Sequence, residues 1–205
     1  MLEEKGYPFK SKEHSLRVDQ FNKGSNAKFI KKYTRQVDYK STFICPKMLL
    51  YQFEEQGKYN YSNRCCYELK KKPFHLWEKE NNKHIAITGM RAEEGGNRQR
   101  LGCIITSGNK VIRFHPLIKV NDEWEEWFIR EYNVKLCRLY YEPYNFERTG
   151  CKGCPYSLNL QEQLEIMERL LPNERKQCEY IWKPVYDEYR RIGYRLKAEE
   201  QTRLF

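Results

Sequence analysis

The chain has 205 residues, of which 40% are hydrophobic and 15% aromatic, and its 38 Lys and Arg residues exceed its 28 Asp and Glu residues by ten. This is the composition of a globular protein, and it excludes a disordered or collagen-like chain. The charge favours anionic partners such as nucleotides, nucleic acids or acidic proteins, although a solvated basic surface would have the same composition.

Hydropathy and the N-terminal residues predict a soluble, cytoplasmic protein. Residues 1–5 are partly acidic and include no apolar run typical of a signal peptide. No apolar run in the chain approaches the ~20 residues that a membrane span needs. Because the cytosol keeps thiols reduced, we expect the eight cysteines to be buried thiols, metal ligands or reactive thiols rather than disulfides.

The first predicted elements are a helix and two strands. A helix is expected over residues 48–53. Residues 84–88 form a short apolar run rich in β-branched residues that ends at Gly89, and residues 111–114 form a second run of the same kind. Such runs are typical of buried strands.

Helices are predicted in the second half of the chain. Asp122 and Asn159 each precede a glutamate by three residues, as in a capping box, and an apolar face follows each of them. The last helix has apolar residues at helical spacing from Cys178 to Ile192. Strands that alternate with helices predict an α/β sheet followed by a helical C-terminal section.

Four cysteines have the spacing of a metal site. Cys65 and Cys66 are adjacent, and Cys151 and Cys154 form a Cys-x-x-Cys motif before Pro155. Two thiolates spaced in this way converge on one side of a turn. Adjacent cysteines direct their thiolates apart, which suits the separate irons of a [4Fe–4S] cluster better than one tetrahedral zinc ion. We predict a [4Fe–4S] cluster on these four residues, with zinc, or thiols that bind no metal, as the alternatives.

The other four cysteines have no such spacing. Cys45, Cys103 and Cys137 stand alone in apolar or strand-like contexts, and Cys178 lies on the apolar face of the last predicted helix. We expect all four to pack in the core.

A charged segment with three glycines follows the first predicted strand. In open α/β sheets, ligands bind beyond the carboxyl ends of the strands. Arg91 and Arg98 could therefore bind a phosphate or sulfate bidentately at this edge. Lys70 could add positive potential beside the cysteine pair. An exposed charged loop and a solvated helix face would produce the same two patterns.

These motifs, in this order, resemble the phosphoadenosine phosphosulfate (PAPS) reductase family. The residues that carry the resemblance are Arg64-Cys65-Cys66 with Lys70 and Pro73, Gly89 to Glu94 with Arg98, His115-Pro116-Leu117, and Arg148 to Pro155. The resemblance runs from residue 6 to about residue 156. It is strongest to the iron–sulfur branch, which is similar to adenylylsulfate reductases, where such cysteines ligate a [4Fe–4S] cluster.

The resemblance implies an adenine nucleotide α-hydrolase-like fold with a parallel sheet. It implies a PAPS reductase-like domain over residues 1–156 and a helical extension over residues 157–205. Family domains begin with a pyrophosphate-binding Ser-Gly-Gly loop, which would lie upstream of residue 6. We therefore expect the domain to be N-terminally truncated, with this loop either supplied by a partner polypeptide or lost from the chain.

The resemblance also implies an adenine nucleotide (PAPS, adenylylsulfate or ATP) bound beside the cluster. The substrate-binding residues would be Arg91, Arg98, Glu94 and Lys70. Reductases of the family carry a nucleophilic cysteine in a Glu-Cys-Gly tail, whereas residues 201–205 read Gln-Thr-Arg-Leu-Phe. Both an oxidoreductase that reduces a sulfonucleotide and an enzyme that transfers sulfur to nucleic acid therefore fit. A zinc-stapled basic module that binds nucleic acid without catalysis is the alternative.

Overall fold

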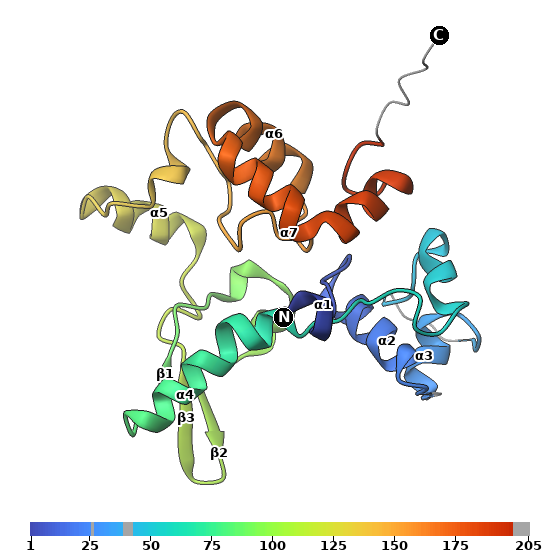
Figure 1. The fold of residues 1–205 in the computed structure, drawn as a ribbon. Helices are drawn as coiled ribbons and strands as arrows, with labels where there is room; N and C mark the ends of the chain where they lie inside the picture. Colours follow the sequence, from blue (N-terminus) through green and yellow to red (C-terminus); the bar gives the residue numbers. More distant parts are fainter. Residues whose placement is uncertain (26, 39–42, 199–205) are drawn as a thin grey trace. The chain divides into compact units, whose positions relative to one another are not determined.

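The structure is a computed structural model that describes residues 1–25, 27–38 and 43–198 (Figure 1). The chain forms two compact units: unit 1 comprises Met1–Lys70 and Leu139–Phe205, and unit 2 comprises Lys71–Arg138. The predicted family boundary at residue 156 stays a prediction, and residues 201–205 lie outside the described part. Within the described ranges, no helix combines the length and apolar character that a membrane crossing requires.

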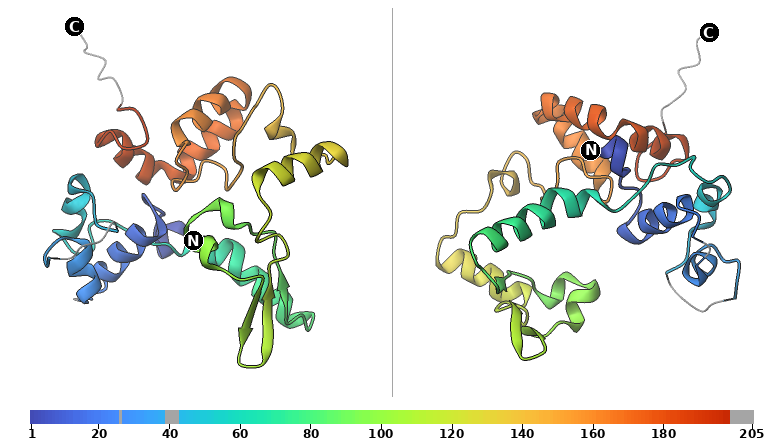
Figure 2. Two further views of the ribbon diagram at one scale, coloured as in Figure 1. Left: turned by 180° about the vertical axis from the view of Figure 1, so that it is seen from behind. Right: turned by 60° about the horizontal axis from the view of Figure 1, so that its bottom comes forward.

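Unit 1 is helical. Its α-helices are α1 (Leu2–Lys5), α2 (Lys12–Asn22), α3 (Lys28–Tyr33), α6 (Leu160–Leu170) and α7 (Pro172–Arg191). Two 3₁₀ helices are η1 (Lys47–Phe53) and η5 (Arg138–Tyr140), and η5 begins one residue before the second segment of the unit. Residues 48–53 are therefore helical as predicted, but they form a 3₁₀ helix, which is wound more tightly than an α-helix. Helices α6 and α7 lie side by side (Figures 1 and 2).

One buried core joins the early and late segments of unit 1. Phe9 stacks on Tyr61 with ring centroids 4.4 Å apart, and it packs against Tyr189 of α7 at 4.7 Å. The apolar spacing predicted for the last helix is confirmed, because Cys178, Trp182, Val185 and Tyr189 are buried. Ile181, which was assigned to the same face, is 40% exposed. Aromatic rings therefore supply much of the area that this unit buries.

Unit 2 holds a small mixed sheet. Its elements are α4 (Lys72–Glu80), β1 (Ala86–Ile87), η3 (Ala92–Glu94), η4 (Gly96–Arg100), β2 (Ile104–Ser107), β3 (Lys110–Phe114) and α5 (Asp122–Glu131). The strand order is β1-β3-β2; β1 pairs parallel to β3, with Ala86 opposite Arg113, and β2 pairs antiparallel to β3. The α/β class is thus observed, but in the described residues only the β1–β3 pair is parallel.

The hairpin β2–β3 explains the mixed sheet, and the sequence analysis did not predict it. A Gly108-Asn109 turn, with Gly108 at φ +58°, joins the two strands. A two-residue turn forces its strands to run antiparallel, and the positive φ that such a turn requires favours glycine. The Gly-Asn dipeptide between two β-branched runs was the available signal.

The two predicted strands exist, but the prediction that they are buried is wrong. Ile85 and Ile87 are 51% and 70% exposed, and every residue of β3 is exposed. Because alternate strand residues face opposite sides, both faces of β3 are open. Side-chain branching favours a strand, whereas burial depends on whether another layer covers the sheet.

Smaller expectations also changed. Helix α5 is capped by Asn121, whose side chain accepts a hydrogen bond from the Trp124 amide at 2.9 Å, one residue before the predicted cap. Asn159 precedes α6, but its side chain makes no cap hydrogen bond. Instead, the side-chain amide of Asn159 donates to Glu147 at 2.9 Å. Among the lone cysteines, Cys45 and Cys178 are buried as predicted, whereas Cys103 and Cys137 are exposed.

Candidate functional site

The Cys-x-x-Cys motif forms a tight turn in unit 1. The Cys154 amide donates to the Cys151 carbonyl at 3.1 Å, and Gly153 has a φ of +59°. A Cβ atom at Gly153 would lie 2.6 Å from both Cys178 Sγ and the Tyr186 hydroxyl oxygen. Glycine is therefore required at this position both for its backbone conformation and for space.

Helix α7 contacts the carbonyl side of this turn. Three of its buried side chains donate hydrogen bonds to main-chain carbonyls: Trp182 Nε1 to Lys152 at 3.1 Å, the Tyr186 hydroxyl to Gly153, and the Tyr189 hydroxyl to Pro155 at 2.9 Å. Arg195, just beyond the helix, also donates to the Pro155 carbonyl. The loop is thus fixed to α7 through its backbone, independently of the cysteine side chains.

The adjacent cysteines stand at the start of a helical stretch. Cys65 is buried and Cys66 is half-buried, and the amides of Tyr67 and Glu68 both donate to the Arg64 carbonyl at 2.9 Å. The stretch continues into the π-helical turn η2 (Tyr67–Lys71). Turns of this kind are often found at functional sites.

Short contacts hold the two cysteine segments in one unit. Tyr7 pairs with Tyr61 through a parallel bridge, and the Ser62 amide donates to the Tyr7 carbonyl at 2.8 Å. From the other segment, the Tyr156 hydroxyl donates to the Ser62 carbonyl at 3.4 Å. Residues flanking the Cys65 pair are therefore connected to residues flanking the Cys-x-x-Cys turn.

The thiols influence one another electrostatically. A hydrogen bond with the Cys66 thiol raises the pKa of Cys65, and burial and the Cys66 and Cys154 thiolates raise it further. Burial raises the pKa of Cys154, and the Cys151 and Cys66 thiolates act in the same direction. Charge on a thiol of one segment therefore affects the titration of a thiol of the other, and the gathering of the four cysteines into one site stays a prediction.

The donor set suits a thiolate-bound metal, although the sulfurs do not converge. In the part of the chain that the structure describes, no three His, Cys, Asp or Glu side chains are positioned to hold a metal ion. Raised thiol pKa values favour the protonated form, whereas a metal binds thiolates and displaces their protons. Four thiols from two joined segments, none of them in a disulfide, fit an iron–sulfur cluster or zinc in chemical kind, and ligation stays a prediction.

The predicted anion-binding residues lie in unit 2, except Lys70, which closes the first segment of unit 1. Arg91 bonds Asp122 and Glu125, each at 2.6 Å, and its side chain is only 13% exposed. Arg98 pairs with Glu94 at 3.1 Å. Carboxylates therefore neutralise both arginines, so neither presents a free guanidinium in this structure.

His115 is a buried group at the same sheet edge to which the sequence analysis gave no role. It follows β3 directly, as Thr88 follows β1, and its Nδ1 lies 2.6 Å from Thr88 Oγ1. His115 is fully buried, and its Nε2 has no hydrogen-bond partner among the described residues. A buried polar atom without a partner costs about 1–3 kcal/mol. The only signals were the position after a strand and the His-Pro-Leu match to the family.

Comparison with known families shows what the chain is. A family model described as "Phosphoadenosine phosphosulfate reductase domain" matches residues 17–157. The chain belongs to this family. The family match supports the α/β nucleotide-hydrolase-like class of fold and a sulfonucleotide-related function, and it implies a nucleotide such as PAPS as ligand. Comparisons with curated proteins and with solved structures gave no match.

The PAPS reductase segment contains the candidate site but not all the residues that support it. All four cysteines and the loop with Arg91 and Arg98 lie within the matched residues 17–157. Helices α6 and α7 follow the matched segment. The family resemblance is thus confirmed, while the iron–sulfur branch stays a prediction.

Proposed function

We propose that this PAPS reductase-family chain holds a [4Fe–4S] cluster on Cys65, Cys66, Cys151 and Cys154, beside which a sulfonucleotide or ATP binds. The observation that carries the proposal is the hydrogen bond between the two cysteine segments, in which the Tyr156 hydroxyl, two residues after Cys154, donates at 3.4 Å to the carbonyl of Ser62, three residues before Cys65. Two segments far apart in sequence thus supply thiols to one region of unit 1.

Burial raises the pKa of Cys154, and two of the chain's own groups offset part of that effect. The Tyr156 amide N–H, hydrogen-bonded to the Cys154 sulfur, lowers the pKa, and the Lys70 ammonium acts in the same direction. When bound, the cluster would supply structural and electrostatic support to an anionic substrate. Lys70 and the Tyr156 amide would stabilise the thiolate at Cys154 and offset part of the cost of burying it.

Nucleotide binding by Arg91, Arg98, Glu94 and Lys70 forms the second part of the proposal. Since Arg91 already bonds two carboxylates, it could bind a sulfate or phosphate group only in competition with Asp122 and Glu125. A partner polypeptide would cover the apolar surface of unit 2. The exposed residues of β3 support that partner, because a sheet normally packs at least one of its faces on a core, whether its strands are parallel or antiparallel.

Two reactions remain within the proposed function, and one alternative lies outside it. Sulfonucleotide reduction would act on an adenylated sulfate, whereas sulfur transfer would use ATP to adenylate a nucleic acid target before sulfur is inserted. The net charge of +10 favours a nucleic acid substrate for the second reaction. The alternative is a zinc-stapled basic module that binds nucleic acid without catalysis.

Metal analysis tests the proposal directly. The chain is purified without oxygen, and iron, acid-labile sulfide and zinc are measured beside the visible spectrum. We expect about four irons and four sulfides per chain. Cys65→Ala and Cys154→Ala should lose them, whereas Cys103→Ala, which removes an exposed thiol of unit 2, should retain them. Zinc without sulfide would favour the alternative, and equal metal content in all variants would refute ligation by these cysteines.

A further inference from the structure

Helix α7 lies outside the matched family segment, yet its side chains make several hydrogen bonds to the backbone of the cysteine loop. Trp182, Tyr186 and Tyr189 are spaced by four and three residues, so they lie on one face of the helix. They are 6%, 0% and 0% exposed. A buried indole N–H or phenol O–H needs a hydrogen-bond partner. Here each one finds that partner in the backbone of the cysteine loop.

The three donors bond three carbonyls within four residues of the loop. They bond the carbonyls of Lys152, Gly153 and Pro155 (Trp182, Tyr186 and Tyr189, respectively). On the outer side, the Lys152 ammonium bonds Glu174 and Gln177 of α7. Because the carbonyls are held against α7, the loop cannot rotate about its long axis without breaking several hydrogen bonds together.

The close approach of the helix reinforces this orientation. Gly153 lies against Cys178 Sγ and the Tyr186 hydroxyl, leaving no room for a Cβ atom. On the sulfur side, the Tyr156 amide is hydrogen-bonded to Cys154. The loop carbonyls thus accept hydrogen bonds from α7, whereas the Tyr156 amide N–H donates to the Cys154 sulfur. Amide hydrogen bonds to sulfur are among the interactions that set the reduction potential of an iron–sulfur cluster.

We propose that α7 positions the Cys-x-x-Cys loop: Trp182, Tyr186 and Tyr189 hold the carbonyls of Lys152, Gly153 and Pro155 and thereby fix the backbone that carries Cys151 and Cys154. These three are positioning residues that act through the loop backbone and touch no ligand. The inference deepens the proposed function and rests on it only where a cluster is concerned. The C-terminal helical section thereby gains a role in the metal centre.

The test compares thiol reactivity in the metal-free, full-length chain. Iodoacetamide labelling of each cysteine is followed in time by peptide mass spectrometry in wild type, Tyr186→Phe and Trp182→Phe. Each substitution keeps an aromatic ring and removes one hydrogen bond to the loop. Tyr180→Phe is the matched control, since Tyr180 lies on the same helix and is 85% exposed. Cys45, buried elsewhere in unit 1, reports global unfolding.

We expect Cys151 and Cys154 to react about fivefold faster in Tyr186→Phe and Trp182→Phe, the factor that corresponds to one ordinary hydrogen bond. Cys45 should keep its rate, and Tyr180→Phe should match wild type. Equal acceleration of Cys45 would show that the tyrosine and tryptophan only stabilise the fold, and unchanged rates at Cys151 and Cys154 would overturn the proposal.

A second readout uses the reconstituted cluster and separates this inference from the proposed function. If the chain binds a cluster, Tyr186→Phe should shift its midpoint potential and speed its loss to a chelator, whereas Tyr180→Phe should do neither. An unshifted potential with an unchanged loss rate would contradict the positioning role. If wild type binds no cluster, the proposed function fails, while the labelling experiment still decides whether α7 positions the loop.

Discussion

At the scale of single residues, the most strongly perturbed histidine is His14 in the core of unit 1. Its Nδ1 lies 2.9 Å from the Tyr33 hydroxyl oxygen and its Nε2 2.7 Å from Gln52 Oε1. The side chain is fully buried, and burial lowers its pKa from 6.5 to about 4. The Gln52 side chain continues this polar chain to Tyr51, which bonds Glu188 of α7. Such a network is stable only while His14 stays neutral.

This makes a prediction for acid stability. Because the folded-state pKa of His14 is below the unfolded value, the unfolded chain binds more protons between pH 6.5 and 4. The contribution of neutral His14 to the free energy of unfolding should be fully present above pH 6.5, and it should fall by about 3 kcal/mol as the pH drops towards 4. Urea unfolding of wild type and His14→Gln at pH 7, 5.5 and 4.5 measures this change in the free energy of unfolding.

The variant should be less stable at pH 7 and lose less stability on acidification than wild type. His75→Gln, which removes an exposed histidine, serves as the control and should follow wild type. If the wild-type and His14→Gln curves fall in parallel between pH 6.5 and 4, the assignment of this acid sensitivity to His14 is wrong.

At the scale of elements, Arg91 ties the loop after β1 to the first turn of α5. It bonds Asp122 and Glu125, and the Asp122 amide donates to Glu93 at 2.8 Å. The same guanidinium was predicted to bind an anion. The carboxylates on α5 therefore compete with any sulfate or phosphate for Arg91, which the loop sequence alone could not show.

Removing the competing carboxylates should strengthen anion binding. We expect Asp122→Asn with Glu125→Gln to raise the affinity for adenylylsulfate about fivefold, since Arg91 then carries an uncompensated charge. Isothermal titration calorimetry at two salt concentrations measures this. Glu55→Gln with Asp187→Asn changes the net charge equally at surface carboxylates of unit 1. An equal gain in both double variants would indicate a general charge effect and remove Arg91 from the binding site.

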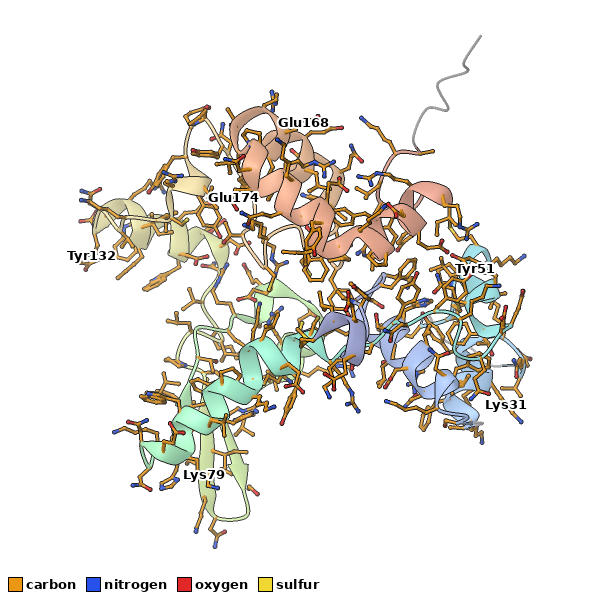
Figure 3. The ribbon with its side chains drawn as sticks, in the orientation of Figure 1. Lys31, Tyr51, Lys79, Tyr132, Glu168 and Glu174 are labelled. Carbon is orange, nitrogen blue, oxygen red and sulfur yellow. The ribbon has the colours of Figure 1, made fainter. Side chains whose placement is uncertain are left out.

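At the scale of the whole chain, the two units differ in how well they bury their apolar residues. The buried core cluster lies in unit 1, whereas unit 2 exposes large apolar side chains on α4, the sheet and α5. Tyr132, just beyond α5, is 63% exposed, and Figure 3 labels it together with Lys79 of α4. Exposed apolar surface on this scale marks an interaction surface and also lowers local stability.

We therefore predict that unit 2 opens before unit 1. In hydrogen exchange, the paired amides of β1 and β3 should exchange at least about tenfold faster than the interior amides of α7, because few buried contacts oppose their opening. In urea, peptides from residues 71–138 should lose protection at lower concentration than peptides from α7. Coincident loss in both units would show one cooperative fold and count against a missing covering partner.

From the sequence alone came the composition class, the helices α5, α6 and α7, both strands of the parallel pair, the family and the four candidate thiols. These depend on local propensity, periodicity and spacing, which each segment carries alone. The three-dimensional structure was needed to show that Ile87 and β3 are exposed, that Cys103 is not a core residue, that carboxylates bond Arg91 and that α7 holds the cysteine loop. Those outcomes depend on contacts between residues distant in sequence, and a buried contact or ion pair belongs to both partners, so neither segment can specify it alone.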